Sequence, residues 1–130
     1  MSAPELISCE QLRQMIDKLS TPQDYLIVDV RDTDFKCGNI PNCINIPSHE
    51  FMSRIEDLKS QLGPSTVPVF HCQLSQVRGP KCARRFMDSY GPTNTRPVFV
   101  LEGGFEAWKE MCGNDTMYVE NIDMEFWSNQ

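Results

Sequence analysis

Apolar side chains follow two different periods in the first part of the chain. From residue 8 to residue 19 they recur at i, i+3, i+4 and i+7, and Ser8 with Gln11 forms a capping-box pattern, which predicts an amphipathic helix. Residues 25–30 are then apolar throughout except for Asp29, which is typical of a strand buried on both faces of a parallel sheet. The chain therefore opens with a helix followed by a buried strand.

The alternation of strands and helices continues to about residue 112. Short strands are predicted at residues 43–46, 67–71 and 97–101. Helices are predicted after Ser48, which takes an N-cap position, around residues 83–90, and after the pair Gly103 and Gly104. Their inward faces consist of apolar side chains at helical spacing: Phe51, Ile55, Leu58 and Leu62, then Ala83, Phe86, Met87 and Tyr90, then Phe105, Trp108 and Cys112.

This alternation predicts an α/β fold in which helices cover both faces of a mostly parallel sheet. Ligands of such folds bind beyond the carboxyl ends of the strands, which directs attention to the residues after Val30, Ile46, His71 and Leu101. A length of 130 residues suits a single domain over residues 1–130.

Composition restricts the expected partners. The chain has no apolar run of about eighteen residues and no secretory pattern, so we expect no membrane partner and a location in the cytoplasm or nucleus. A net charge of −6 opposes binding to nucleic acid. The acidic end of the chain, residues 113–130, is expected to fold back onto the domain through Tyr118, Ile122, Phe126 and Trp127.

Positive charge is concentrated in one stretch. Residues 59–87 contain no acidic residue and carry +5, so the rest of the chain carries −11. The cations are Lys59, Arg78, Lys81, Arg84 and Arg85. A local positive region would attract an anionic substrate to an otherwise acidic protein. For Arg84 and Arg85 we favour a plainer interpretation, the solvated face of a helix.

The cysteines do not form a metal-binding pattern. None of the six stands in a Cys-x-x-Cys pair, and the chain has only two histidines, so we expect reduced thiols, no metal and no cofactor. Most of these thiols are expected to be small buried apolar groups.

A Cys-x5-Arg segment at a strand-to-helix junction carries the strongest chemical signal. Cys72 follows a predicted strand, Arg78 stands six positions later, and Pro80 suits the first turn of the next helix. Amides at a helix N-terminus bind anions and favour the thiolate form of a cysteine placed there. The loop of Gln73, Leu74, Ser75, Gln76, Val77 and Arg78 is therefore predicted to bind a phosphate-like oxyanion, with Cys72 as nucleophile and the planar fork of Arg78 as clamp.

Four segments together resemble the rhodanese-like domain over nearly the whole chain. They are residues 26–31 (LIVDVR), residues 38–47 (GNIPNCINIP), residues 71–80 (HCQLSQVRGP) and residues 101–108 (LEGGFEAW). The loop is similar to that of M-phase inducer dual-specificity phosphatases and fungal arsenate reductases, in particular small single-domain fungal phosphatases of that group.

The resemblance implies a three-layer sandwich with about five strands and a phosphocysteine intermediate on Cys72. It also implies that loop length separates two chemistries. Sulfur-transferring rhodaneses have a loop that is one residue shorter, whereas five residues between Cys72 and Arg78 suit a tetrahedral oxyanion. The expected substrate is a phosphorylated protein, at phosphotyrosine or phosphothreonine, or a small phosphate ester. The resemblance leaves arsenate reduction as the main alternative, ahead of sulfur transfer and of a module that only binds phosphate.

The general acid is left open by the sequence. The M-phase inducer loop carries a glutamate among its variable residues, but residues 73–77 contain none. Asp29, Asp32, Asp34 and Glu102 are candidates from their position at the sheet edge, although Asp29 with Arg31 also resembles a structural ion pair of the family.

Three further residues keep two interpretations each. His71 either supports Cys72 through the loop backbone or is a strand-end residue with a local partner. Ser75 either braces the loop or is a small turn residue. For Cys82 we favour a buried core thiol over a resolving thiol for Cys72.

Overall fold

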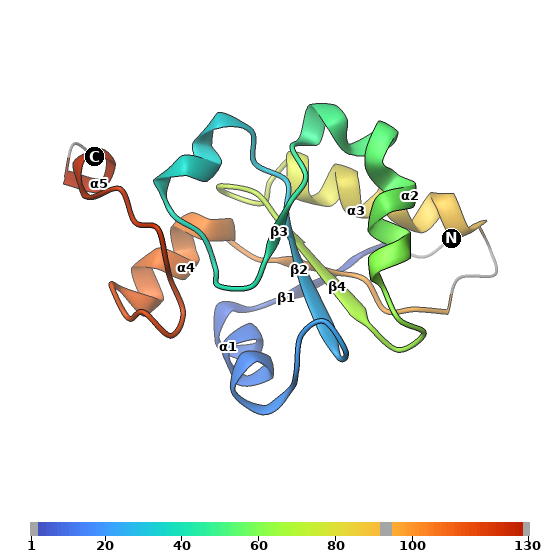
Figure 1. The fold of residues 1–130 in the computed structure, drawn as a ribbon, viewed down its shortest axis with the longest axis horizontal. Helices are drawn as coiled ribbons and strands as arrows, with labels where there is room; N and C mark the ends of the chain where they lie inside the picture. Colours follow the sequence, from blue (N-terminus) through green and yellow to red (C-terminus); the bar gives the residue numbers. More distant parts are fainter. Residues whose placement is uncertain (1–2, 92–94, 129–130) are drawn as a thin grey trace.

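A parallel sheet forms the centre of the molecule (Figure 1). The computed structural model describes residues 3–91 and 95–128, and within them five strands pair in the order β1-β5-β4-β2-β3, with every neighbouring pair parallel. The strands are β1 (Glu5–Ile7), β2 (Tyr25–Asp29), β3 (Ile44–Asn45), β4 (Val67–His71) and β5 (Phe99–Leu101). The predicted α/β class and parallel sheet are confirmed.

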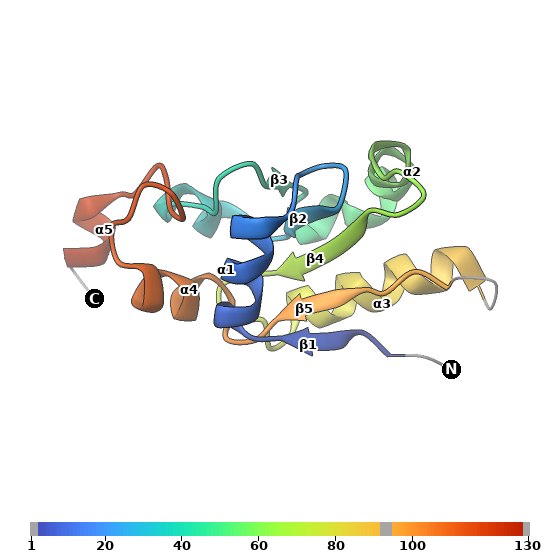
Figure 2. The same cartoon turned by 90° about the horizontal axis from the view of Figure 1, so that it is seen from below.

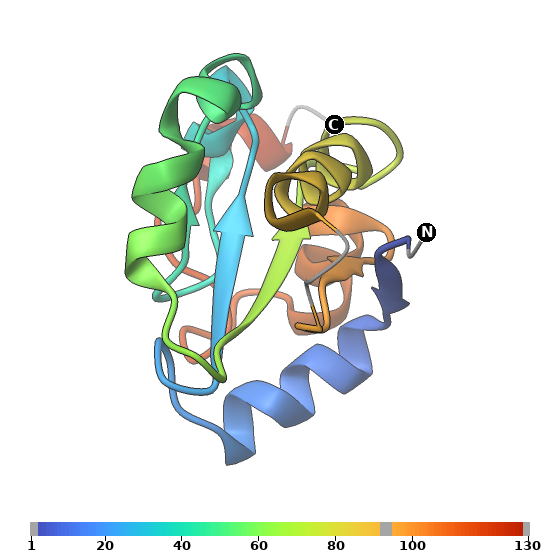
Figure 3. The same ribbon diagram turned by 90° about the vertical axis from the view of Figure 1, so that its right-hand side faces the viewer.

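Helices cover both faces of the sheet, which gives three layers (Figure 3). Helices α2 (Phe51–Gln61) and α3 (Arg78–Tyr90) pack on one face, and α1 (Cys9–Lys18) and α4 (Gly104–Cys112) on the other. Two 3-10 turns, η1 (Thr33–Cys37) and η2 (Ser48–Glu50), follow β2 and β3, and a short helix α5 (Met124–Ser128) ends the described chain. Among the residues described, no helix is both long and apolar enough to span a membrane.

Each face of the sheet has its own apolar core. Phe51, Phe70 and Phe86 are fully buried between the sheet and the pair α2 and α3, with the Phe70 ring centroid 5.8 Å from that of Phe51 and 5.6 Å from that of Phe86. Leu12 and Trp108 are fully buried on the opposite face. Successive side chains of β2 and β4 point to opposite faces of the sheet and pack alternately into one core and the other, as a sheet buried on both faces requires.

Two local features differ from the prediction. The first strand, β1, was not located from the pattern, because only Ile7 of its three residues is buried. Ser48 does not cap α2, since it begins the turn η2 and its hydroxyl donates to Asp32 Oδ2 at 2.9 Å. Helix α3 begins at Arg78, so Pro80 lies in its first turn as predicted. The capping box of Ser8 and Gln11 is present as predicted.

The C-terminal segment crosses the η1 side of the molecule and packs beside α4 (Figure 1). Tyr118 and Val119 are buried in the core under α4. Asn39 and Glu120 exchange two backbone hydrogen bonds of 2.9 Å, and the Trp127 indole N–H donates to the Cys37 carbonyl at 2.8 Å. The segment therefore fixes the loop that follows β2.

Candidate functional site

The carboxyl ends of β2, β3 and β4 meet at one edge of the sheet, and the chemistry-bearing residues lie there. The Val30 N–H donates to the His71 carbonyl at 2.9 Å, and the Ser48 N–H donates to the Val30 carbonyl at 3.1 Å. These bonds bring together the loop after β2, the turn η2 and the Cys-x5-Arg loop, as expected for a parallel sheet.

The Cys72 loop connects β4 directly to α3. Cys72 is buried, and its Sγ accepts the N–H of Ser75 at 3.2 Å and the N–H of Gly79 at 3.4 Å. Ser75 has a left-handed backbone with φ of 54°, which turns its amide toward the sulfur, and its Oγ accepts the Cys72 N–H at 3.4 Å. Two amides thus point at one sulfur at a helix N-terminus. Of the two interpretations of Ser75, these contacts match the bracing one.

Helix α4 holds the start of this loop. The amides of Phe105 and Glu106 donate to the carbonyls of Cys72 and Gln73, each at 3.0 Å. The preceding Gly104 has φ of +62°, and a Cβ atom there would lie 2.5 Å from both carbonyl oxygens. Only glycine permits this close approach.

Arg78 is bound to carboxylates in this structure. Its Nη1 and Nη2 donate to Asp34 Oδ1 at 3.0 Å and Oδ2 at 2.6 Å, and Nη1 also lies 3.3 Å from Asp32 Oδ2. The hydrogen bonds to Asp34 raise the pKa of Arg78 above its ordinary value despite partial burial. The guanidinium therefore faces the carboxylates of Asp32 and Asp34. To bind an oxyanion in the loop, the side chain would have to turn away from them.

Both carboxylates beside Arg78 are held in their charged form. Burial opposes ionisation of Asp34, but hydrogen bonds from Arg78 and the charges of Arg78 and Arg31 outweigh it and lower the pKa of Asp34. Burial likewise opposes ionisation of Asp32, and hydrogen bonds from His49, Ser48 and Arg78 outweigh it and lower that pKa. In the free protein both carboxylates are therefore ionised at neutral pH.

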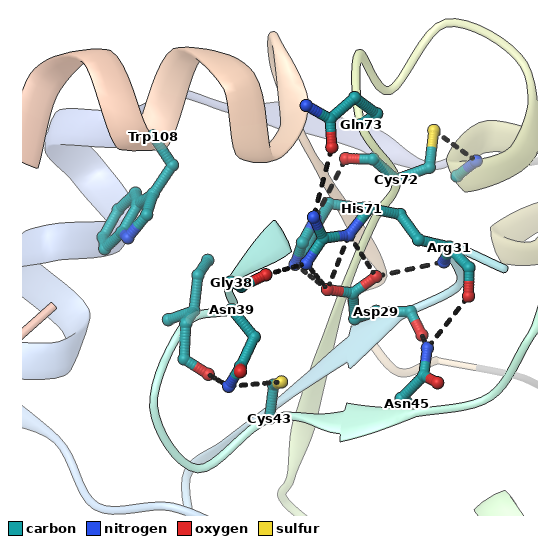
Figure 4. A network of polar contacts seen from close by, with 12 residues as sticks. Asp29, Arg31, Gly38, Asn39, Cys43, Asn45, His71, Cys72, Gln73 and Trp108 are labelled. Atoms are coloured by element: carbon teal, nitrogen blue, oxygen red, sulfur yellow. Dashed lines mark hydrogen bonds and ion pairs between the residues drawn. The ribbon is translucent and has the colours of Figure 1, made fainter. Parts of the chain in front are cut away.

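Asp29 and Arg31 form a fully buried ion pair beneath the loop (Figure 4). Arg31 Nη2 lies 2.7 Å from Asp29 Oδ2, and the guanidinium stacks over the Phe105 ring at 4.3 Å. Its Nη1 donates to Gln73 Oε1 at 3.1 Å, and its Nη2 donates to the Gly38 carbonyl at 2.5 Å. Asp29 is thus a structural partner of Arg31, and the pair connects β2, η1, the Cys72 loop and α4.

His71 is buried between this ion pair and the loop. Its Nδ1 lies 3.1 Å from the Cys72 carbonyl, and because a carbonyl only accepts, Nδ1 carries the proton. Nε2 lies 3.5 Å from Asp29 Oδ2 and has no hydrogen-bond partner among the described residues. Complete burial lowers the pKa of His71 more than the attraction of Asp29 raises it, so the ring is neutral near pH 7. The hydrogen bond from His71 Nδ1 to the Cys72 carbonyl supports the loop backbone at Cys72.

His49 was not connected to the site by the sequence, because it lies more than twenty residues before Cys72 on a separate turn. Its Nδ1 lies 2.7 Å from Asp32 Oδ1, and Nε2 lies 3.4 Å from Glu50 Oε2. The ring is largely exposed and lines a cavity of about 320 Å³ together with Val77, Arg78 and Cys82. The sequence did hold one indication that His49 lies near the site: it follows the strand β3, which ends at the same edge of the sheet as β4.

In the part of the chain that the structure describes, two remaining candidates, Cys82 and Glu102, make no contact with the Cys72 loop that supports a chemical role. Cys82 is buried in the α3 core, and burial raises the pKa of its thiol to about 11, which matches the interpretation as a core residue. Glu102 is exposed, and its backbone N–H donates to the Ile7 carbonyl at 2.9 Å. Within the residues described, no group of three or more His, Cys, Asp or Glu side chains is placed to hold a metal ion.

Comparison with known proteins decides the family. A family model described as the rhodanese-like domain matches residues 8–111 of the chain. The chain belongs to this family. The resemblance noted in the sequence is thereby confirmed, and the parallel sheet with helices on both faces is the fold of this rhodanese-like domain.

Relatives of this rhodanese-like domain include two kinds of enzyme. The dual specificity phosphatase ibp1 of Schizosaccharomyces pombe is 30% identical over 138 residues, which cover 92% of this chain and 99% of that protein. Arsenate reductase 2.1 of Oryza sativa subsp. japonica is 38% identical over 88 residues, covering 64% of this chain and 55% of that protein. The domain is therefore homologous both to dual specificity phosphatases and to arsenate reductases.

A solved structure shows the same fold over the whole chain. Ygr203w, a yeast protein tyrosine phosphatase of the rhodanese family, superposes with a TM-score of 0.80 at 21% sequence identity, covering 98% of this chain and 99% of that one.

Proposed function

We propose that this rhodanese-like domain is a phosphatase that hydrolyses phosphate monoesters through a phosphocysteine on Cys72, with phosphotyrosine or phosphothreonine of proteins as expected substrates. The observation that carries the proposal is the Cys72 loop. Its sulfur accepts two amides, at 3.2 and 3.4 Å, at the N-terminus of α3, and five residues separate it from Arg78. The relatives that are phosphatases support the same choice.

In the first step, the Cys72 thiolate attacks phosphorus. The S–P bond forms as the bond to the ester oxygen breaks, and the electron pair of that bond leaves with the oxygen. Arg78 turns from Asp34 to the equatorial phosphate oxygens, and the amides of residues 73–78 bind the same oxygens. Catalysis then rests mainly on positioning and on electrostatic stabilisation.

The leaving oxygen also needs a proton, and His49 is the side chain we assign to supply it. Imidazole is a group that exchanges protons near neutral pH, and the ring lines the cavity beside Arg78, with Nδ1 2.7 Å from Asp32 Oδ1 and Nε2 3.4 Å from Glu50 Oε2. In the second step, water attacks phosphorus, gives its proton to the neutral imidazole, and releases phosphate and the Cys72 thiolate.

Cys72 and Arg78 are tested directly with p-nitrophenyl phosphate. We expect Cys72→Ser to abolish turnover and Arg78→Lys to lower kcat/KM by about 10²-fold or more, because an ammonium cannot bind two phosphate oxygens in the planar fork geometry. A transient phosphoenzyme trapped by rapid acid quench in the wild type, and missing in Cys72→Ser, would identify the intermediate. Full activity of Cys72→Ser would refute the proposal.

Arsenate reduction is the second candidate, because arsenate has the shape and charge of phosphate and some relatives are arsenate reductases. One purified preparation should be assayed on aryl phosphate, on arsenate with glutathione, and on thiosulfate with cyanide. We expect the first activity to dominate. Dominant arsenate turnover would reverse the order, dominant cyanide turnover would indicate sulfur transfer, and tight phosphopeptide binding without turnover would indicate a binding module.

A further inference from the structure

A groove runs from the Cys72 loop along the outer edge of the sheet, on the face where α3 lies. The strand β1 is the edge strand and lies beside β5, next to α3 (Figure 2). The groove has a volume of about 520 Å³, which is within the range of ligand-binding clefts. The residues that line it come from β1 and its approach, the loop, α3 and β5: Ala3, Pro4, Leu6, Gln76, Val77, Pro80, Lys81, Arg84 and Val100.

The groove adjoins the loop of the proposed phosphate site. Gln76 and Val77 belong to the loop whose amides would bind phosphate oxygens, and both line the groove. A phosphorylated residue seated over Cys72 would therefore direct one flank of its own chain into the groove.

The floor of the groove is apolar and open. Leu6 is 63% exposed and Val77 is 69% exposed, although both are large apolar side chains. Both line the same groove, together with the half-buried Pro80, so the groove presents apolar side chains to solvent.

The α3 wall of the groove is positively charged. Lys81 and Arg84 line it, and no acidic residue is among the lining residues. Within the described part of the chain, neither cation forms an ion pair with a carboxylate. The rest of the chain is strongly acidic, so two unneutralised cations beside an apolar floor favour an occupant that is both acidic and apolar.

We propose that this groove binds the segment of a phosphoprotein substrate next to the phosphorylated residue, and that it selects a flank with an apolar side chain and an acidic side chain. The proposal rests on the proposed phosphatase function and adds its substrate preference. The apolar side chain packs on Leu6 and Val77, and the acidic side chain pairs with Arg84 and Lys81. This also changes the interpretation of Arg84, which the sequence alone assigned to a solvated helix face.

The test compares two acidic-apolar phosphotyrosine peptides with a neutral reference peptide that differs from each of them only in one flank. The acidic-apolar peptides carry Leu and two Glu next to the phosphotyrosine, placed on the N-terminal side in one version and on the C-terminal side in the other, and the reference peptide carries Ala and Gln instead. We expect the wild type to prefer an acidic-apolar version by about tenfold in kcat/KM, mainly through KM, and the preference to shrink as salt is raised.

Two variants test the groove and one serves as the matched control. Arg84→Glu and Leu6→Ser should each reduce the preference, expressed as the ratio of kcat/KM between the preferred acidic-apolar peptide and the reference peptide. Arg85→Glu makes the same charge change one residue later, and Arg85 does not line the groove but the neighbouring cavity that holds His49 and Arg78. Arg85→Glu should retain the wild-type ratio.

The outcomes separate this proposal from the phosphatase function. If the wild type hydrolyses aryl phosphate but shows the same kcat/KM for every peptide, the groove proposal is wrong and the phosphatase function stands. If Arg84→Glu and Arg85→Glu reduce the ratio equally, the preference comes from the general field and the groove proposal is also wrong. If the wild type hydrolyses neither aryl phosphate nor peptide, the proposed function itself is wrong.

Discussion

In the free protein the Arg78 guanidinium binds both oxygens of Asp34, at 3.0 and 2.6 Å. If the proposed phosphate site is correct, a phosphate in the loop would compete with Asp34 for this planar fork. On binding, one bidentate ion pair would then be exchanged for another, and Asp34 would lose the contact that lowers its pKa. The ion pair with Asp34 orders the Arg78 side chain in the free site.

The assignment of His49 predicts a dependence on the leaving group. His49→Gln should lower kcat/KM for an alkyl phosphate by about 10²-fold but should change kcat/KM for p-nitrophenyl phosphate little, because kcat/KM reports the step in which the ester bond breaks, and a good leaving group needs no proton there. The measurement is the slope of log kcat/KM against leaving-group pKa over a series of phosphate esters, which should steepen in the variant.

Glu50→Gln is the matched control for His49. It removes the carboxylate that lies 3.4 Å from Nε2 but retains the imidazole, so the wild-type slope should persist. Equal losses on all esters in His49→Gln would show that the ring only supports the structure, and would contradict its role as proton donor.

At the scale of elements, the contact between α4 and the Cys72 loop is the one most sensitive to a single atom. A Cβ at Gly104 would lie 2.5 Å from the carbonyl oxygens of Cys72 and Gln73, and φ there is +62°. We expect Gly104→Ala to lower the free energy of unfolding by about 1–3 kcal/mol and kcat/KM by at least about tenfold, because the loop must shift.

Gly113 offers a control with a similar φ but no neighbour. Its φ is +63°, and a Cβ there would meet nothing within 4 Å. Gly113→Ala should therefore show only the cost of alanine at a positive φ, about 1–3 kcal/mol, with wild-type kcat/KM. Denaturant unfolding and steady-state kinetics of both variants separate backbone strain from displacement of the loop.

Elements with a strong local pattern could be predicted from the sequence, and those without one could not. Helix α1 and strand β2 follow from apolar spacing and, for the helix, from the capping residues. Strand β1 could not be predicted, because its order comes from pairing with β5, and only one of its three residues is buried. Ser48 has the right type and position for an N-cap but donates to a carboxylate from another loop.

The same limit applies to the site. The positions of Cys72 and Arg78 at a strand-to-helix junction could be predicted, because the loop is continuous in sequence. The pairing of Arg78 with Asp34, the contact of His49 with Asp32 and the close approach of Gly104 all join residues far apart in the chain. Such contacts depend on which strands are neighbours, and spacing along one segment does not contain that information.

At the scale of the whole molecule, His71 links stability to pH. Its pKa is lowered from the ordinary value of 6.5 by complete burial, so below about pH 6.5 the unfolded chain takes up a proton that the folded chain does not. The free energy of unfolding should therefore fall as pH decreases from about 6.5. Denaturant unfolding from pH 7.5 to pH 5 measures the slope.

A variant of His71 tests whether this residue causes the dependence of the free energy of unfolding on pH. His71→Gln should flatten it, whatever the variant does to stability at pH 7.5. A slope that is identical in the wild type and in His71→Gln would show that other groups cause it.

The packing of the C-terminal segment gives the protein two built-in fluorescent reporters. The chain has two tryptophans. Trp108 is fully buried and donates to the Tyr118 carbonyl at 2.7 Å, so its emission changes only when the core under α4 opens. Trp127 is half-buried and is held to Cys37, beside the loop that carries Asp34. A soluble quencher that reaches Trp127 before Trp108 would therefore separate detachment of the C-terminal segment from global unfolding without any added label.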